Sequence, residues 1–423
     1  MTEGTIWRQI LLFSIPLILG NLLQQMYNTV DSIIVGNFVG SNALAAVGSS
    51  TSLICLLIAF SMGASAGAGV IVSQFYGAGD ENGVQRSAHT ALMLALILGI
   101  VLTIAGIVFS PAILRWMRTP EEVMNQSVLY LRIYSYGLVF NVIYNMAAGI
   151  LNAVGNSRRS LMYLAVASFS NIFLDLWLIG GMHMGVEGAA IATDISQVLS
   201  CIFALWFLMR VPDIYRINPK KLSIDRTMAG RIIQVGLPTA IQNTVISFSN
   251  VLVQSGVNGF GASAMAGFGA YLKVDGFNIL PVMSFSMAAT TFTGQNYGAG
   301  KTDRIRKGLR VTLGMSVLYT IVTGILLLTF SILHLFTQDD TVVEFGVAAM
   351  KYFCPFYFLL GIMHSLAGTI RGTGKTVPPM VVMLLALCLF RILWIQFVVP
   401  HFTSIDIIYV LYPVSWAVGM VLM

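Results

Sequence analysis

The sequence predicts an all-α integral membrane protein with twelve transmembrane helices in two pseudo-symmetric six-helix bundles around a central cleft. Three observations predict this fold class. First, 57% of the 423 residues are hydrophobic and only 9% are charged, whereas soluble domains carry about 25% charged residues. Second, apolar stretches long enough to cross a bilayer recur along the whole chain. Third, the second half of the sequence repeats the first.

Twelve apolar stretches are each long enough to cross ~30 Å of hydrocarbon as a helix, which takes roughly 20 residues. The mean hydropathy of the chain, +0.83, agrees with this interpretation. The first stretch lacks a cleavage site of small residues, so we expect it to remain in the mature protein. The predicted spans are 9–36, 44–75, 88–111, 125–152, 159–180, 187–210, 231–258, 264–296, 309–336, 343–370, 377–400 and 404–423.

The basic residues outside these spans indicate how the chain is oriented. The net charge is +6, and most Lys and Arg of the connecting segments fall on the face that includes the polar segment 211–230. The opposite face carries Arg115 and Arg118. Positive residues favour the cytoplasmic side of a membrane, so we expect a multi-pass protein of the cytoplasmic (inner) membrane with both termini in the cytoplasm. The excess of basic residues reflects the topology of the chain in the membrane, and we expect no nucleic-acid partner.

Similarity between the halves indicates that one six-helix unit was duplicated. SQFYGAG at 73–79 matches GQNYGAG at 294–300, a shift of 295 − 74 = 221 residues. AGILNAVGNS at 148–157 matches AGTIRGTGKT at 367–376, a shift of 367 − 148 = 219 residues. Because six spans return the chain to the side on which it began, both copies cross the membrane in the same sense, as in a parallel repeat.

The segment 211–230 divides the chain into an N-terminal lobe, 1–210, and a C-terminal lobe, 231–423. Two similar bundles that face each other leave a cleft between them. Rocking one bundle against the other exposes a central site to each side of the membrane in turn. The architecture is therefore that of a carrier, and an inert duplicated scaffold is the alternative.

Four acidic residues lie inside the predicted spans and away from the first few residues of each: Asp31, Asp175, Asp194 and Asp275. A charged side chain at this depth costs ~2.5 to 3.5 kcal/mol on insertion scales, so each needs a partner or a function. Asp31, Asp175 and Asp194 lie close to the outer ends of their spans, roughly 8 to 13 Å deep at a rise of 1.5 Å per residue. We therefore expect these three at similar depth.

The predicted site combines Asp31 and Asp175 with Asn171 and Thr193. Asn171 precedes Asp175 by four residues, which places both side chains on one helix face. Thr193 offers a hydroxyl at the same depth, whereas the neighbouring Asp194 points about 100° away. Two carboxylates, an amide and a hydroxyl suit a hard cation such as sodium, or a shared proton.

In the alternative interpretation, each acid pairs with a buried base and serves packing only. Asp275 is two residues from Lys273, but side chains at i and i+2 point to different faces of a helix, and Arg391 is the other deep cation. The two spans that carry Asp31 and Asp175 have no base at the depth of these acids. Function is therefore favoured for that pair.

Pro16 lies fifteen residues before Asp31 in the first span. A proline removes one backbone hydrogen bond of the helix, so the helix can bend there when the acid is neutralised. A proline that is merely tolerated near the end of a membrane helix is the alternative.

Motifs of nucleotide hydrolysis and of other catalysis are missing. GTGKT at 372–376 resembles the end of a P-loop, but Thr369 occupies the position of the first glycine and no strand precedes it. No HExxH motif, catalytic acid pair or Ser-His-Asp arrangement is present. We expect neither an enzyme nor an ATP-driven pump, and no cofactor other than a coupling ion.

The sequence resembles the multidrug and toxic compound extrusion (MATE) transporters over essentially its whole length. The resemblance is carried by the proline and aspartate of the first span, by SQFYGAG and GQNYGAG, by the N-x-x-x-D of 171–175 and by GAAIAT at 188–193. It implies cation-coupled export by two six-helix lobes. It also implies a cation site at Asp31, Asn171, Asp175 and Thr193, with Pro16 at the helix bend.

Members of the NorM-like branch place carboxylates in spans 7 and 10. Span 7 reads GLPTAIQNTVISFSNVL, without an acid, and span 10 has no acid beyond Glu344 at its start. The chain therefore resembles the DinF-like branch instead. A second cation site in the C-terminal lobe is therefore not expected.

We expect a monomeric antiporter that exports amphipathic, often cationic, organic compounds in exchange for inward sodium or protons. Soft, polarisable side chains suit such substrates because they adapt to many shapes and hold cations over aromatic rings. A flippase for lipid-linked saccharides is the alternative, and a channel is a third. The residues expected to line the substrate cavity are Met26, Tyr27, Tyr144, Met146, Met265, Lys273, Asp275, Met283, Phe285 and Met287.

Overall fold

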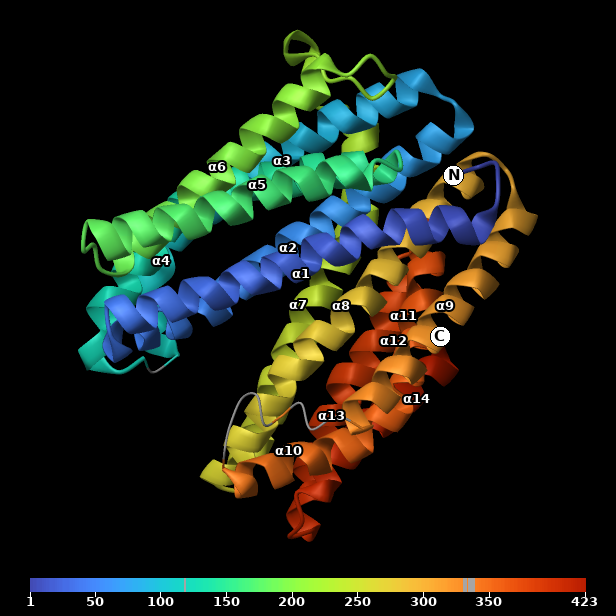
Figure 1. Ribbon diagram of the computed structural model, residues 1–423. Helices are drawn as coiled ribbons and strands as arrows, with labels where there is room; N and C mark the ends of the chain where they lie inside the picture. The colour runs from blue at the N-terminus through green and yellow to red at the C-terminus, as the bar shows by residue number, and fades with distance from the viewer. Residues whose placement is uncertain (118, 330–332, 334–338) are drawn as a thin grey trace. The chain divides into compact units, whose positions relative to one another are not determined.

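The structure, a computed structural model, describes residues 1–117, 119–329, 333 and 339–423. Within these residues the chain forms twelve helical segments, six in each half, and no β-strand, so the predicted fold class is confirmed (Figure 1). Eight of the segments are long and apolar enough to cross a membrane. The remaining four are α14, which has 17 residues, and the helices α4, α7 and α8, which carry more polar side chains.

The helices of the first half are α1 (Ile6–Phe38), α2 (Ser41–Ala78), α3 (Glu81–Trp116), α4 (Glu121–Ala153), α5 (Ser157–Asp175) with the π-helix η1 (Leu176–Gly181), and α6 (Val186–Arg210). A short 3-10 helix, η2 (Pro219–Lys221), lies in the linker. The second half has α7 (Arg226–Asn258), α8 (Ala262–Gly298), α9 (Thr302–Thr329), α10 (Asp340–Phe353), η4 (Cys354–Phe356), α11 (Tyr357–Gly372), α12 (Val377–Leu384), η5 (Leu385–Leu389), α13 (Phe390–Leu393), η6 (Trp394–Val398), η7 (Val399–His401) and α14 (Asp406–Leu422).

The helices extend beyond the predicted apolar spans. α3 begins at Glu81, because Asp80 caps it by accepting a hydrogen bond of 3.0 Å from the Gly83 N–H. Polar residues outside the hydrocarbon thus continue the helix, although hydropathy alone places its start at 88. Arg118 and the end of the predicted span 309–336 lie outside the described residues.

The chain folds into two compact units whose boundaries fall within α1 and α7. One unit comprises residues 15–240, and the other comprises residues 1–14 and 241–423. The first turns of α1 therefore belong to the unit formed by the second half, and the first turns of α7 belong to the unit formed by the first half. The crossing in α1 lies beside Pro16 and that in α7 lies beside Pro238, both of which are inside continuous helices.

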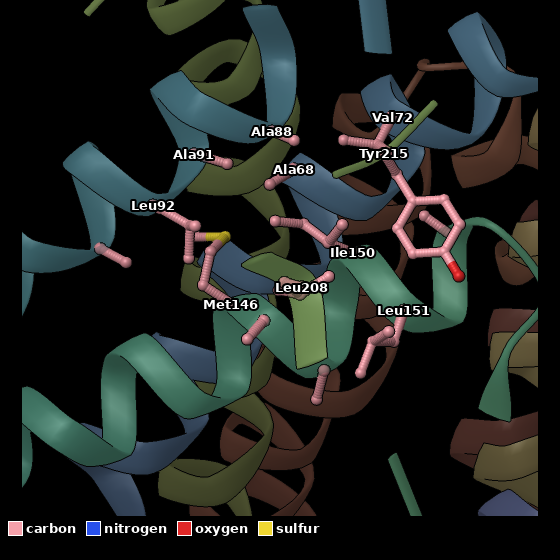
Figure 2. Packing of buried hydrophobic residues seen from close by; sticks show 14 of the residues in the cluster. Ala68, Val72, Ala88, Ala91, Leu92, Met146, Ile150, Leu151, Leu208 and Tyr215 are labelled. Carbon is pink, nitrogen blue, oxygen red and sulfur yellow. The ribbon is translucent and has the colours of Figure 1, made fainter. Parts of the chain in front are cut away.

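The core of the 15–240 unit is built around α4, which packs against α2, α3 and α6. Figure 2 shows how small and branched side chains from these helices interlock, among them Ala68 on α2, Ala88 on α3, Ile150 on α4 and Leu208 on α6, each fully buried. Alanine at the contact points lets the helix axes approach closely, as in other membrane bundles.

The start of α7 is fastened to this unit through small residues and through the linker. A Cβ atom at Gly67 of α2 would collide with the backbone of Gly236 in α7, so only glycine permits this approach. Asp225 caps α7 by accepting hydrogen bonds from the backbone N–H groups of Thr227 and Met228 at 2.9 and 3.0 Å. Its carboxylate also binds Arg86 on α3. The hydrogen bond from Arg86 holds the pKa of Asp225 below its usual range.

The start of α1 is fastened to the other unit by Arg304 on α9. Its guanidinium donates hydrogen bonds to the backbone oxygens of Gly4 at 3.0 Å and Met1 at 3.2 Å, and to the side-chain oxygen of Gln9 at 3.3 Å. An arginine that donates to several acceptors in fixed geometry holds a segment firmly.

Aromatic rings fill the core of the second unit where α8, α10, α11 and α14 meet. The ring of Phe353, which is fully buried, has its centroid 4.8 Å from that of Tyr271 and 4.7 Å from that of Tyr412. Tyr357 stacks on Trp416 with centroids 5.7 Å apart. Rings at these separations contribute stability beyond the area they bury.

Candidate functional site

Helices α1 and α5 bring two acidic side chains together inside the 15–240 unit. Asp31 lies near the end of α1, and Asp175 is the last residue of α5, where the π-helix η1 begins. The two carboxyl groups lie against each other. Asp175 is fully buried and Asp31 is partly buried. Short π-helical segments occur frequently at functional sites because they redirect side chains within a helix.

Acceptors outnumber donors around this pair. Both oxygens of Asp175, one oxygen of Asp31 and the side-chain oxygen of Asn171 are buried without a hydrogen-bond donor among the described residues. Buried acceptors without donors are costly and are rare in proteins. Two adjacent carboxylates also repel each other unless a proton or a cation neutralises one of them.

Asn171 and Thr193 complete the cluster. The amide of Asn171 donates a hydrogen bond of 3.3 Å to the Thr193 hydroxyl, which itself donates to the Ala189 carbonyl at 3.0 Å. These bonds turn the amide nitrogen of Asn171 away, and its oxygen is left as an acceptor. The structure thus brings together the four residues predicted as a site: Asp31, Asn171, Asp175 and Thr193.

The oxygen ligands of this cluster fit a hard cation or a proton better than a transition metal. Oxygen ligands from carboxylate, amide and hydroxyl groups suit hard ions, whereas imidazole and thiolate favour zinc or copper. No group of three or more His, Cys, Asp or Glu side chains within the described residues is arranged to hold a metal ion.

The interpretation that these acids pair with buried bases finds no support in the described part of the chain. The ion pair found there joins Arg86 to Asp225 in the linker, and neither Asp31 nor Asp175 contacts a Lys, Arg or His side chain. The third acid, Asp194, packs against α4, where its carboxylate occupies the space beside Gly137 that a Cβ atom would fill.

Two tyrosines of α4 belong to this region although sequence reasoning did not select them. Tyr130 and Tyr134 are buried, with 4% and 6% of their surfaces exposed, and their ring centroids lie 6.2 Å apart. Tyr130 is within electrostatic range of Asp31 and Asp175. The spacing of four residues in YLRIY was the available signal, but tyrosines at that spacing are also typical of an ordinary helix core.

The residues predicted to line a substrate cavity lie in different environments. Tyr144 and Met146 are buried in the core of the 15–240 unit, where Figure 2 shows Met146 beside Leu92, and Phe285 is buried in the other unit. Met26, Met265 and Met283 are exposed. The remaining members of the set differ again: Lys273 is exposed, whereas Tyr27, Asp275 and Met287 are partly buried.

Asp275, the intramembrane acid of the second half, has hydrogen-bond partners that Asp31 and Asp175 lack. Asp275 on α8 accepts a hydrogen bond of 2.6 Å from the Tyr357 hydroxyl, which lies 2.7 Å from the hydroxyl of Tyr271. Arg391, also buried, is within electrostatic range of Asp275. The guanidinium of Arg391 donates to Ser415 at 3.1 Å and to the side-chain oxygen of Asn250 at 3.3 Å.

Pro16 is buried within α1, which runs as one helix from Ile6 to Phe38. The crossing of the chain from one unit to the other lies between Ser14 and Ile15. The helix therefore lacks one backbone hydrogen bond at the point where it passes between the units.

Comparison with known proteins relates this arrangement to a family. The family model described as MatE matches the chain twice, at residues 16–177 and 238–395, once in each half. The probable multidrug resistance protein YoeA of Bacillus subtilis (strain 168) is 30% identical over 432 residues, covering 100% of this chain and 93% of that protein. The probable multidrug resistance protein NorM of Thermotoga maritima is 27% identical over 399 residues, covering 91% of this chain and 84% of that protein.

A solved structure shares the fold. It is described as the outward-facing conformation of a multidrug resistance MATE family transporter of the MOP superfamily, and it matches with a TM-score of 0.91 at 23% identity, covering 100% of this chain and 94% of that chain. The alternative of a flippase for lipid-linked saccharides finds no support in these comparisons, because the relatives carry multidrug resistance names.

Proposed function

Because the chain belongs to the MatE family, we propose that it is a cation-coupled antiporter that exports amphipathic, often cationic, organic compounds in exchange for inward sodium or protons. One observation carries the coupling part of this proposal: the adjacent carboxyl groups of Asp31 and Asp175 are buried without a base and with too few donors. Such a pair favours whatever proton or cation neutralises it.

Neutralisation is the step that links the ion to the conformation. When both acids are ionised, their repulsion favours a state in which α1 and α5 separate or admit water. A proton or a sodium ion on the pair removes this repulsion and favours the state in which the carboxyl groups lie together. Asn171 and Thr193 contribute oxygen ligands, and their own hydrogen bond keeps these ligands in place.

Pro16 supplies the flexibility that this step requires. The helix that carries Asp31 lacks a backbone bond near Pro16, so neutralisation at one end of α1 can change the bend at the other. The lobes proposed to move are residues 1–210 and 231–423, joined by the linker 211–230. The bend then alters how much of the exposed apolar surface of α1, including Met26, is available to a drug.

Coupling requires that the ion and the drug stabilise different conformations. A ligand shifts a two-state equilibrium only by the difference between its affinities for the two states. A shift from 1:99 to 99:1 takes a preference of about 10⁴-fold, about 5.5 kcal/mol. A buried carboxylate pair supplies a preference of this size readily, because its charge is expensive to bury when it is not neutralised.

Cationic amphiphiles are the substrates that this surface suits best. Thioether and aromatic side chains bind organic cations without demanding one shape, and Met26, Met265 and Met283 are exposed. The protein acts as a monomer in the cytoplasmic membrane with both termini inside, needs no ATP and carries no cofactor other than the coupling ion. Its cellular role is drug and xenobiotic efflux, which confers antibiotic resistance.

Transport of a fluorescent cationic dye tests the proposal. Purified protein is reconstituted in vesicles, and an inward sodium gradient and an inward proton gradient are imposed separately. We expect dye movement against its own gradient under at least one of them, and the effective gradient identifies the coupling ion. Failure of both gradients to drive the dye, for a protein that remains folded, contradicts the proposed function.

A further inference from the structure

Helices α1 and α7 pass from one compact unit to the other at equivalent positions of the repeat. The crossing follows residue 14 in α1 and residue 240 in α7. Pro16 and Pro238 lie beside these crossings and are related by a shift of 238 − 16 = 222 residues. Because a proline removes a backbone hydrogen bond, each helix can bend where it changes unit. How firmly the start of each helix is held therefore decides whether a movement passes along it from one unit to the other.

The start of α1 is held by an arginine that is itself fixed. The Nε of Arg304 on α9 donates a hydrogen bond of 3.1 Å to the side-chain oxygen of Asn296 on α8. The guanidinium lies 5.8 Å from the ring centroid of Phe292, a distance at which a cation is attracted to the ring. The amide nitrogen of Asn296 donates in turn to the Phe292 carbonyl at 2.8 Å. One edge of the guanidinium is thus bound to α8, and its two terminal nitrogens bind other groups.

Those two nitrogens bind the segment that leads into α1 and the first turn of the helix. The acceptors are the backbone oxygens of Met1, Glu3 and Gly4, at 3.2, 3.3 and 3.0 Å, and the side-chain oxygen of Gln9, at 3.3 Å. Lys301, at the turn between α8 and α9, adds a bond of 3.0 Å to the backbone oxygen of Thr2. Charged donors form stronger hydrogen bonds than neutral ones, so the position of this segment depends strongly on Arg304.

The start of α7 is held in another way, by close packing of the backbone. A Cβ atom added at Gly63 of α2 would lie 2.3 Å from the Cα of Ala240, and one added at Gly67 would lie 2.2 Å from the Cα of Gly236. Small residues permit this approach of two helices. In α1, residues 6–14 contain neither glycine nor alanine. The start of α1 therefore relies more on hydrogen bonds from α9 than on close contact between helix backbones.

Of these two helices, only α1 carries an acid. Asp31 lies near the end of α1 in the 15–240 unit, whereas α7 contains neither Asp nor Glu. A helix is a stiff element, so a rearrangement around Asp31 reaches the other unit along α1 when the start of the helix is fixed there. When the start is free, the first turns of α1 move instead and the other unit does not respond.

We propose that Arg304 is a positioning residue for ion coupling. It fixes the start of α1 to the unit formed by the second half, so that ion binding at Asp31 in the first half is transmitted to that unit. Arg304 lies at the opposite end of α1 from the cation site and acts through the helix. The inference rests on the proposed cation-coupled antiport, and it names the contact through which the coupling passes.

The transport test uses Arg304→Met, which removes the hydrogen-bond donors and keeps an apolar stem. Purified full-length protein in vesicles moves a fluorescent cationic dye in two modes: under an imposed sodium or proton gradient, and down the gradient of the dye with no ion gradient. We expect ion-driven transport to fall roughly tenfold or more, because the ion no longer acts on both units. Downhill movement should stay close to the wild-type rate, because the packing within each unit is kept.

Two further variants and one kinetic constant separate positioning from general damage. Arg306→Met is the matched control, because Arg306 is exposed on the same helix, and it should leave both modes unchanged. Arg304→Lys keeps the charge but lacks the planar fork, so its ion-driven rate should lie between those of the wild type and Arg304→Met. The concentration of coupling ion for half-maximal transport should not change in Arg304→Met, since the cation site is intact. An equal loss in both modes, or a changed half-maximal concentration at an unchanged maximal rate, overturns the proposal.

Spin labels test the anchor without transport. The labels are attached at Arg8→Cys on α1 and Leu318→Cys on α9, which are exposed positions in the same unit. The four native cysteines are replaced by alanine. We expect one narrow distribution of distances between the labels when Arg304 is present and a broad distribution when Arg304→Met is added.

The two measurements give distinct outcomes. An unchanged distance distribution in Arg304→Met shows that Arg304 is not the anchor, and full ion-driven transport by this variant shows that coupling does not need the anchor. Either result overturns the proposal. If the wild type shows no ion-driven transport, the proposed function fails and the coupling role falls with it, while the spin labels still report whether Arg304 holds the start of α1.

Discussion

The intramembrane acids of the two halves show opposite solutions to the same problem. In the second half, Asp275 accepts a hydrogen bond from Tyr357 and is within range of Arg391, so residues that are always present compensate its charge. In the first half, Asp31 and Asp175 lie against each other with too few donors and without a base among the described residues. The first arrangement is complete within the protein, whereas the second requires a proton or cation from outside.

The backbone of the two halves is more alike than their side chains. The π-helix η1 begins after Asp175, and η6 begins at Trp394, which is the equivalent position because 175 + 219 = 394. The duplicated helix therefore carries a π-helical distortion near the same position in both halves, and the second half has a further one, η5, where the first half is α-helical. The acid is present in only one of them, which separates the shape of the site from its charge.

The largest effect is expected when the unsatisfied pair loses one charge. Asp31→Asn removes the repulsion that makes the pair bind a proton or cation, so gradient-driven dye export should fall to background while the protein remains folded and inserted. Dye transport in vesicles and the amount of monodisperse purified protein measure the two parts of this prediction. Asp303→Asn, an exposed acid at the start of α9, is the control and should transport normally.

Normal export by Asp31→Asn would remove the basis for the comparison between the halves. The buried acid pair would then be a structural feature, and the coupling site would have to lie elsewhere in the chain.

A second prediction concerns stability and sets the two halves directly against each other. Asp275→Asn removes the charge that compensates Arg391 and weakens the bond from Tyr357, so we expect a loss of about 1 to 3 kcal/mol. Asp175→Asn removes a repulsion instead, so the protein should keep its stability or gain some when sodium is absent at neutral pH. Thermal unfolding of both variants beside the wild type measures the difference, and shifts of the same sign and size would contradict it.

A smaller effect is expected from the neutral members of the first-half site. Thr193→Val keeps the side-chain shape but removes the hydroxyl that accepts from Asn171. The oxygen of Asn171 is then less firmly oriented, and the concentration of coupling ion for half-maximal transport should rise about tenfold, equivalent to about 1.4 kcal/mol. Thr193→Ser restores the hydroxyl and should restore the wild-type value. An equal loss in both variants would point to packing.

Depth and spacing in the sequence were sufficient to predict the cluster of the first half. A carboxylate is rare inside a membrane span, so Asp31 and Asp175 stand out, and the four-residue spacing of Asn171 orients it with Asp175. The structure brings these residues and Thr193 together, while their role in coupling remains a prediction. Tyr130 and Tyr134 could not be selected, because an aromatic residue in a membrane helix has many ordinary explanations.

Other features depend on tertiary packing that the sequence does not reveal. The membrane helices are apolar on all sides, so no amphipathic pattern distinguishes the buried Met146 from the exposed Met26. The repeat divides the chain at the linker, but the packed units exchange the first turns of α1 and α7. That exchange depends on close contacts such as the one between Gly67 and Gly236, which no local pattern predicts.

The smallest expected effect lies in the linker, where an acid is compensated outside the membrane. The pKa of Asp225 is lowered by its hydrogen bond from Arg86, so the folded state holds the ionised form more strongly than the unfolded state does. This contribution to stability is present above the ordinary aspartate pKa of about 3.9 and is lost as the pH falls through the lowered value. Asp225→Asn should therefore lower the unfolding temperature slightly at neutral pH, and the difference from the wild type should shrink in acid.

Asp213→Asn changes an exposed acid of the same linker that has no ion pair among the described residues, and its unfolding temperature should show no such dependence on pH. If the deficit of Asp225→Asn stays constant with pH, the charge of Asp225 contributes nothing, and its hydrogen bonds to the start of α7 account for the whole effect.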